Sequence, residues 1–304
     1  MTPDRPTRKR PKAASAAVVE FFGLVRDELR SYDPAGPTSA ELNRYLRPQL
    51  GPGGGPSSLG VAGYSARVRP LVEVLLSAPA GLRILDAGSG YGTESLLFAW
   101  LGAAVTAVEL VRERHDLARA RAEAFRSRDG APLRVEFLNA NILRYLEGAR
   151  TFDVIWAMEA ISHIYPPEHF LALARERLAP GGILAVSDPN RANPVAWLRA
   201  VRIRGSIHHE PHREFNDPES GAPVEYGREL IHSIRAMERL LVRTGFRVEK
   251  AQTAGFLAST LVPRSWRSRR LPAAAALAFQ SAASRMPILR RFGANYTILA
   301  RRST

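Results

Sequence analysis

Residues 83–94 read RILDAGSGYGTE, and this stretch decides the fold expected for the chain of 304 residues. Its apolar first half predicts a strand at 83–87, and the glycines at 88, 90 and 92 predict a turn that leads into a helix. Glycines in such a turn let the backbone approach a ligand closely, in conformations that a Cβ would forbid. Asp86 precedes the first glycine, where its charge would repel a phosphate but suits a ligand with an ammonium group or hydroxyls.

The rest of the chain continues this alternation of strands and helices. Apolar patterning predicts further strands at 104–109, 133–138, 152–157 and 182–187, with helices at 92–101, 112–127 and 167–178 between them. Short apolar strands separated by amphipathic helices are typical of a parallel sheet with helices on both faces. A helix at 228–244, a strand from Phe246 and a last strand at 296–300 complete seven strands.

The net charge of +14 is concentrated at the two ends. Residues 1–15 carry +4 and residues 264–304 carry +9, which leaves +1 for the body between them. Basic ends can contact nucleic acid or anionic lipid, and solvated tails are the alternative. No apolar run approaches the ~18 residues of a membrane-spanning helix, so we expect a cytoplasmic protein.

Polar side chains stand where the next strands end. Glu109 lies about 20 residues after the glycine turn, where a carboxylate can bind both hydroxyls of a ribose. Asn141 follows the third strand and can bond the edge of an adenine. The fourth strand runs into residues 159–163, EAISH, at the carboxyl end of the sheet, where ligands of open parallel sheets bind.

The chain resembles the class I S-adenosylmethionine-dependent methyltransferases over roughly residues 64–255 and 295–302. The residues that carry the resemblance are 85–92 (LDAGSGYG), Glu109, 152–163 and 178–182 (LAPGG). It implies an α/β, Rossmann-like, mostly parallel seven-stranded sheet with strand order 3-2-1-4-5-7-6, an antiparallel last strand and helices on both faces.

The resemblance also implies how the chain holds its cofactor, S-adenosyl-L-methionine. The glycine turn would pass the methionine part, Asp86 would help to place the amino group, and Glu109 would bind the ribose hydroxyls. The family usually has an Asp at the position of Asn141, and an Asn oxygen can accept the same hydrogen bond from the adenine. The predicted cofactor-binding residues are Asp86, Gly88, Ser89, Gly90, Gly92, Glu109, Leu110, Asn141, Ile142 and Met158.

Glu159 and His163 are the predicted catalytic residues. In some small-molecule methyltransferases of this family a histidine at the position of His163 sits beside the acceptor and can act as a base, a role that suits imidazole near neutral pH. A structural histidine bonded to nearby backbone is the alternative. Ser162 stands at the position where methyltransferases of the ubiquinone pathway have a glutamate. No metal site is predicted.

The resemblance divides the chain into five expected parts. They are a disordered basic tail at 1–15, a helical cap at 16–80, a cofactor-binding half at 81–188, a lid insertion at 189–226, and a C-terminal half at 227–304 with a basic, Ala-rich insertion at 256–293. Contacts with the acceptor are predicted for His208, His209 and His212 of the lid and for Asp188 beside it; a plain surface loop is the alternative.

The predicted function is methyl transfer to a small-molecule acceptor, at an oxygen, in bacterial secondary, glycan or quinone metabolism. One alternative is a methyltransferase acting on RNA or another nucleic acid. Against this alternative, Met158-Glu159-Ala160-Ile161 stands at the position where DNA amino-methylating enzymes have an Asp/Asn-Pro-Pro-aromatic motif. The other is a non-catalytic, membrane-peripheral protein that binds the cofactor and contacts lipid through 264–291. The sequence leaves the oligomeric state open.

Overall fold

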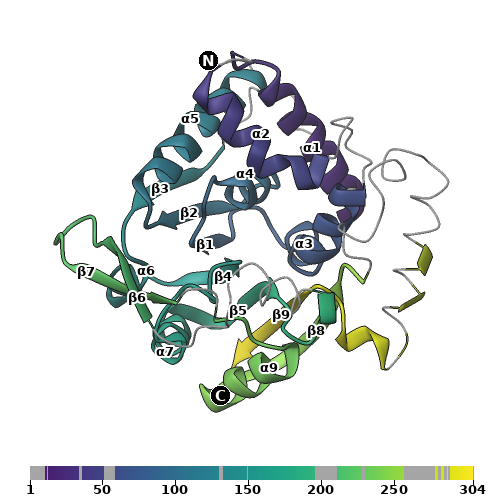
Figure 1. The fold of residues 1–304 in the computed structure, drawn as a ribbon, viewed down its shortest axis with the longest axis vertical. Helices are drawn as coiled ribbons and strands as arrows, with labels where there is room; N and C mark the ends of the chain where they lie inside the picture. Colours follow the sequence, from purple (N-terminus) through teal and green to yellow (C-terminus); the bar gives the residue numbers. More distant parts are fainter. Residues whose placement is uncertain are drawn as a thin grey trace.

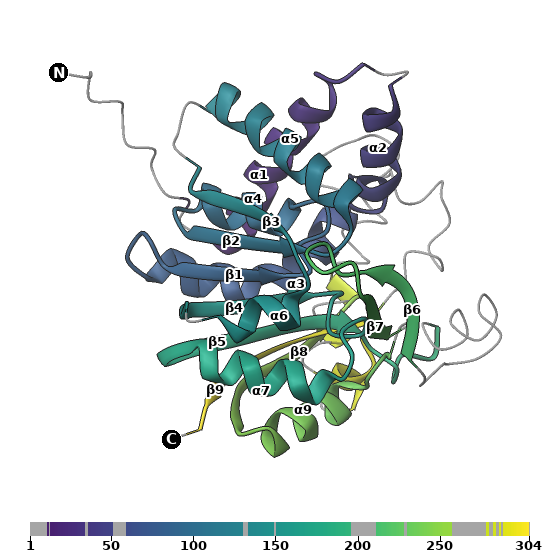
Figure 2. The same cartoon turned by 90° about the vertical axis from the view of Figure 1, so that its left-hand side faces the viewer.

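A seven-stranded sheet organises the molecule (Figure 2). The computed structural model describes residues 11, 13–33, 36–50, 59–129, 133–148, 150–195, 211–227, 230–256, 278–279, 282–283, 286 and 288–303. The strands of the sheet are β1 (Arg83–Ala87), β2 (Ala104–Glu109), β3 (Val135–Asn139), β4 (Phe152–Met158), β5 (Leu178–Pro189), β8 (Phe246–Ala254) and β9 (Asn295–Arg302).

The strand order is β3-β2-β1-β4-β5-β9-β8. The pairs among β1 to β5 are parallel, whereas β9 runs antiparallel to β5 and to β8. When the seven strands are numbered among themselves, this is the predicted order 3-2-1-4-5-7-6 with an antiparallel last strand. The predicted fold class is confirmed.

Successive side chains of the central strands enter two different apolar cores. In β4, Val154 and Trp156 belong to one core, while Ile155 and Ala157 belong to the other. A strand buried on both faces must be apolar at nearly every position, which explains the continuous apolar run of this strand.

Helices cover both faces of the sheet, as Figure 1 shows. The first core is closed by α1 (Ala14–Leu29), α2 (Pro37–Leu50), α3 (Leu59–Ser77), α4 (Thr93–Trp100) and α5 (Arg112–Asp129). The second is closed by α6 (Ile142–Glu147), α7 (Pro167–Arg177) and α9 (Ile234–Arg243). Helices α1 and α2 pack on α3 and form a layer outside the sheet-contacting helices.

A separate antiparallel hairpin, β6 (Pro211–Asn216) and β7 (Pro223–Gly227), lies in the predicted lid insertion. Asp217 holds its turn by accepting hydrogen bonds from the backbone N–H groups of Ser220 at 2.8 Å and Glu219 at 3.1 Å. Arg144 of α6 donates to the same carboxylate at 3.0 Å, so the tip of the hairpin is tied to the body.

Several element boundaries differ from the prediction. The helix predicted at 228–244 begins at Ile234, because the Ser233 hydroxyl caps it by accepting the N–H of Ala236 at 3.2 Å. Helix α2 lies within the expected helical cap, but no separate helix was predicted at its position. Its buried residues Leu42, Leu46 and Leu50 repeat every four positions on an otherwise polar segment, which gives a weak signal in the sequence.

Candidate active site

The glycine turn after β1 is built by three glycines in left-handed conformations, with φ of +73° at Gly88, +54° at Gly90 and +73° at Gly92. A Cβ on Gly88 would lie 2.9 Å from the Cβ of Ala160, and one on Gly92 would lie 2.8 Å from the ring of Phe137. A Cβ on Gly90 would meet nothing within 4 Å. The outer glycines therefore permit close packing of the turn, while Gly90 faces open space.

Glu109, at the end of β2, holds this turn in place. One carboxylate oxygen accepts the N–H of Gly90 at 2.8 Å, and the other accepts the N–H of Val111 at 2.9 Å. A carboxylate oxygen has more than one lone pair, so each can accept a further hydrogen bond from a ligand. The hydroxyl of Ser89 is buried and has no hydrogen-bond partner in the described part of the chain, which leaves a second polar atom at the turn for a ligand.

A cavity of about 330 Å³ opens above the turn, within the range of small-molecule sites. Residues 88–91 and Glu109 form its floor, and Met158, Glu159 and His163 bring the end of β4 to it. Predicted cofactor and catalytic residues therefore line one space, at the carboxyl ends of β1, β2 and β4.

Helix α2 covers the cavity. Its side chains were not predicted as site residues, because no separate helix was predicted at 37–50. Glu41, Arg44 and Tyr45 belong to the lining. The ring of Tyr45 lies 4.5 Å from that of Tyr91, whose hydroxyl donates a hydrogen bond to Glu41. That bond is the main reason why the pKa of Glu41 falls below its usual value.

A buried ion pair connects the N-terminal helices to the glycine turn. Arg121 of α5 donates two hydrogen bonds to the carboxylate of Glu28 in α1, at 2.9 and 3.0 Å, and both side chains are fully buried. The same guanidinium donates to the carbonyl of Tyr91 at 2.7 Å. One side chain thus fixes both α1 and the turn.

On the acceptor side of the cavity, Glu159 is held in an unusual backbone conformation, with φ of +51°. Arg67 of α3 donates to its carboxylate at 2.5 Å and to the hydroxyl of Ser187 in β5 at 3.2 Å. The charge of Arg67 holds the pKa of Glu159 below its usual range. Arg67 was not predicted as a site residue, because its partners lie in distant parts of the sequence.

His163 contacts the β6–β7 hairpin. Its Nδ1 lies 3.1 Å from the carbonyl oxygen of Gly227, and its ring stacks on that of Tyr226 at 5.9 Å. A carbonyl only accepts, so Nδ1 carries a proton, and in the neutral form of the ring Nε2 is the acceptor. His163 thus makes the backbone hydrogen bond of a structural histidine and, in its neutral form, also has the tautomer that a general base requires.

Five predicted cofactor residues lie outside the lining of the cavity: Asp86, Gly92, Leu110, Asn141 and Ile142. Asp86 is buried and accepts a 2.5 Å hydrogen bond from Ser95, and burial is the main cause that raises its pKa to about 8. Asn141 caps α6 by accepting the N–H of Leu143 at 3.0 Å. Their contacts with a ligand stay predictions.

The predicted acceptor residues are less well placed by the structure. Asp188 is buried beneath the cavity lining, accepts the N–H of Ser162 at 3.2 Å, and has its pKa raised well above the usual value, chiefly by burial. His212 pairs with Tyr226 in the hairpin, whereas His208 and His209 lie outside the described residues. Within the described ranges, no three His, Asp or Glu side chains gather as a metal site would require, and the absence of a metal stays a prediction.

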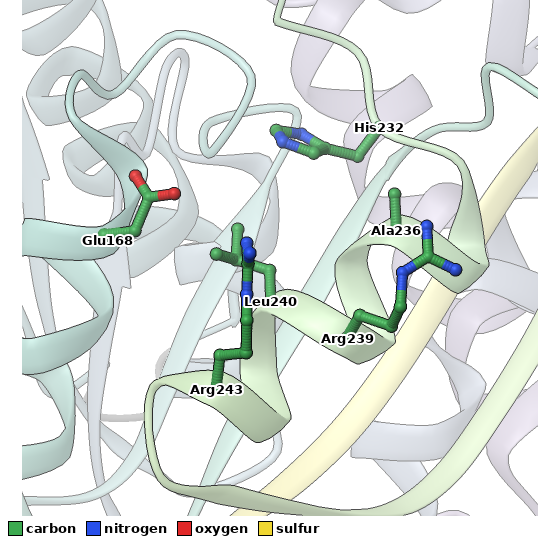
Figure 3. A pocket seen from close by; sticks show the side chains of 6 residues that line it. All are labelled: Glu168, His232, Ala236, Arg239, Leu240 and Arg243. Atoms are coloured by element: carbon green, nitrogen blue, oxygen red, sulfur yellow. The ribbon is translucent and has the colours of Figure 1, made fainter.

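A second cavity, of about 240 Å³, lies between α7 and α9 (Figure 3). Its polar lining comes from Glu168, His232, Arg239 and Arg243, and none of the predicted site residues reaches it. The cavity above the glycine turn is therefore the candidate active site.

Known proteins are similar to this chain in sequence. A family model described as a methyltransferase domain matches residues 62–251. Ubiquinone biosynthesis O-methyltransferase from Cereibacter sphaeroides is 34% identical over 129 residues, which are 41% of this chain and 49% of the relative. The same enzyme from Xanthomonas axonopodis pv. citri is 38% identical over 124 residues, 40% of this chain and 49% of the relative. The chain spans about half the length of the curated relatives it matches.

Two solved structures share the fold. Magnesium protoporphyrin IX methyltransferase from Synechocystis PCC 6803, solved with bound SAH, covers 93% of this chain over its whole length, with a TM-score of 0.50 and 14% identity. A putative methyltransferase in complex with the Haloferax volcanii Trm112 activator covers 88% of this chain with 96% of its own, with a TM-score of 0.51 and 12% identity.

Proposed function

Because this chain belongs to the methyltransferase-domain family, as its sequence predicts, we propose that it transfers the methyl group of S-adenosylmethionine to an oxygen of a small-molecule acceptor. The observation that carries the proposal is the meeting of the glycine turn and Glu109 with Glu159 and His163 in one cavity. The names of the O-methyltransferase relatives support oxygen as the target atom.

The residues of the cavity fit such a cofactor. Gly90 leaves room for close approach, the buried Ser89 hydroxyl needs a partner, and the Glu109 carboxylate can accept from two ribose hydroxyls. The carboxylates of Glu41 and Glu159 suit the positive charge of a sulfonium and an ammonium. Bound there, S-adenosylmethionine supplies a sulfonium methyl that a nucleophilic oxygen can attack in line.

The chain's own residues would then align the acceptor and take up its proton. His163 is the proposed base, since Nε2 can accept the proton of an acceptor hydroxyl while Nδ1 stays bonded to Gly227. Glu159, fixed by Arg67, is proposed to orient the acceptor against the donor methyl. Because a sulfonium is already reactive, most of the rate enhancement would come from this alignment and from exclusion of water.

Other predictions from the sequence bear on the same proposal. The nucleic-acid and non-catalytic alternatives are not favoured by the O-methyltransferase relatives. No helix in the described ranges has the length and apolarity needed to cross a bilayer. A cytoplasmic location, a lipid contact through 264–291 and acceptor contacts in the lid stay predictions, and most of 264–291 lies outside the described residues.

Transfer of a labelled methyl group from S-adenosylmethionine to phenolic, sugar and quinol acceptors tests the proposal. We expect an O-methylated product from at least one of these classes, and at least about 10²-fold slower formation of it by the His163→Gln variant. Transfer to RNA alone, or cofactor binding without transfer to any acceptor, would contradict it.

A further inference from the structure

The segment before β9 carries most of the exposed large apolar side chains of the described residues. Phe279, Met286, Ile288, Leu289 and Phe292 are five of the seven; Val19 and Val242 are the others. Ile288 is 75% and Phe292 41% exposed, and residues 288–292, which we call the 288–292 patch, also expose Arg290 and Arg291. Apolar side chains gathered on a surface in this way indicate an interaction site.

The backbone of the patch is fixed to the body of the protein. The buried side-chain amide of Asn190, directly after β5, donates to the carbonyls of Arg291 at 2.9 Å and Gly293 at 2.8 Å. Asn193 donates to the carbonyl of Phe292 at 2.6 Å, and the Thr253 hydroxyl donates to that of Arg290. The apolar side chains are therefore displayed on an anchored turn, the short helix η1 (Leu289–Arg291) and its flanks.

The charge around the patch identifies the kind of partner. Arg290 and Arg291 form no ion pair with any described residue. A second copy of the chain would bring an equal positive charge against this one, and a nucleic acid would leave the apolar side chains without a partner. Anionic lipid suits both the arginines and the apolar side chains of the patch, because its head groups attract arginine and its acyl region accepts apolar side chains.

The patch also lies at the edge of the sheet that holds the candidate active site. Asn190 follows the carboxyl end of β5, the strand whose Ser187 bonds Arg67 beneath the cavity. In Figure 1 the yellow segment that leads into β9 runs beside β8, where it contacts that strand. A surface bound to the patch would thus meet the protein at the carboxyl edge of the sheet.

We propose that the 288–292 patch docks the protein on anionic lipid bilayers. Ile288, Leu289 and Phe292 enter the interface between head groups and acyl chains, and Arg290 and Arg291 bind the anionic head groups. Docking is a property of this surface and does not depend on the proposed methyl transfer.

Cosedimentation of the full chain with phosphatidylcholine vesicles, with and without phosphatidylglycerol, tests the proposal. We expect the wild type to bind the anionic vesicles only. The Ile288→Ser/Phe292→Ser variant should lose at least tenfold in partitioning, and the Arg290→Gln/Arg291→Gln variant about fivefold per arginine. Val242→Ser, which removes a 62% exposed apolar side chain on α9, is the matched control and should bind like the wild type.

Three outcomes would overturn the proposal: equal binding to neutral vesicles, undiminished binding by both double variants, or a dimer of the wild type that the Ile288→Ser/Phe292→Ser variant loses. Urea denaturation shows that the same variants remain folded. Calorimetry with S-adenosylmethionine separates this proposal from the methyl-transfer proposal, since either result can fail alone.

Discussion

The two sides of the cavity are assembled in different ways. On the cofactor side, Gly90 and Glu109 are 19 positions apart, in consecutive strand–turn–helix units whose strands pair directly. On the acceptor side, Arg67 and Glu159 are 92 positions apart, and His163 and Gly227 are 64 apart. The bond between Glu109 and the glycine turn is thus formed locally within the parallel sheet, whereas the acceptor-side contacts depend on α3 and on the hairpin being correctly docked.

This difference has a consequence for how each side can vary. Changing the hairpin or α3 alters the acceptor side without touching the bond between Glu109 and the glycine turn. Changing the turn disturbs the packing of β1 against β2 and thus the fold. Substitutions should therefore separate the two sides.

Arg121→Met should give the largest effect, on stability. It leaves the buried Glu28 carboxylate without its partner and frees the carbonyl of Tyr91, so we expect a loss of about 3–5 kcal/mol in the free energy of unfolding. Urea denaturation measures it. The double variant Glu28→Leu/Arg121→Met should recover most of the loss, and no recovery would show that the ion pair is not the cause.

His163→Gln should act on turnover alone. Loss of a general base costs about 10²- to 10⁴-fold in kcat, while the cofactor side stays intact. The affinity for S-adenosylmethionine, measured by calorimetry, should remain within about twofold of the wild-type value. If turnover is unchanged, His163 serves only to hold the hairpin.

Arg67→Met should reduce turnover by about 10²-fold, because Glu159 loses the group that fixes its carboxylate and is misplaced. The KM for the acceptor should rise more than that for the cofactor. Adding Glu159→Gln removes the unpaired charge, and this double variant should regain thermal stability but not turnover. Equal increases in both KM values would place Arg67 on the cofactor side instead.

Asp86→Asn should act on the pH dependence of stability. The folded protein holds the proton of Asp86 up to about pH 8, whereas the unfolded chain releases it near the ordinary value of 3.8. The folded state therefore binds more protons between these values, and this carboxyl makes stability fall as pH rises across the window. The variant should flatten that fall in denaturation series from pH 4 to 8; an unchanged slope would show that Asp86 is already ionised.

The same contrast explains what the sequence could predict. The order of the seven strands and the pairing of the glycine turn with Glu109 follow from short-range apolar patterning and one local motif. A helical cap at 16–80 was predicted, but the contacts of Arg67, of Tyr91 and of the side chains of α2 were not, because nothing in residues 37–50 or around position 67 signals a partner so far away in the chain. Ser233 is a typical helix N-cap residue and could have indicated the start of α9. The apolar residues before it led instead to a predicted start at 228.

Calorimetric titration with S-adenosylmethionine tests the central claim most directly, namely that the cofactor binds above the glycine turn and on Glu109. The variants are Glu109→Ala and, as control, Glu136→Ala, which removes a half-exposed carboxylate from β3. The claim predicts wild-type binding that Glu109→Ala weakens by about 10- to 100-fold, as expected for lost hydrogen bonds to a charged group, and that Glu136→Ala leaves unchanged. Undiminished binding by Glu109→Ala would contradict it.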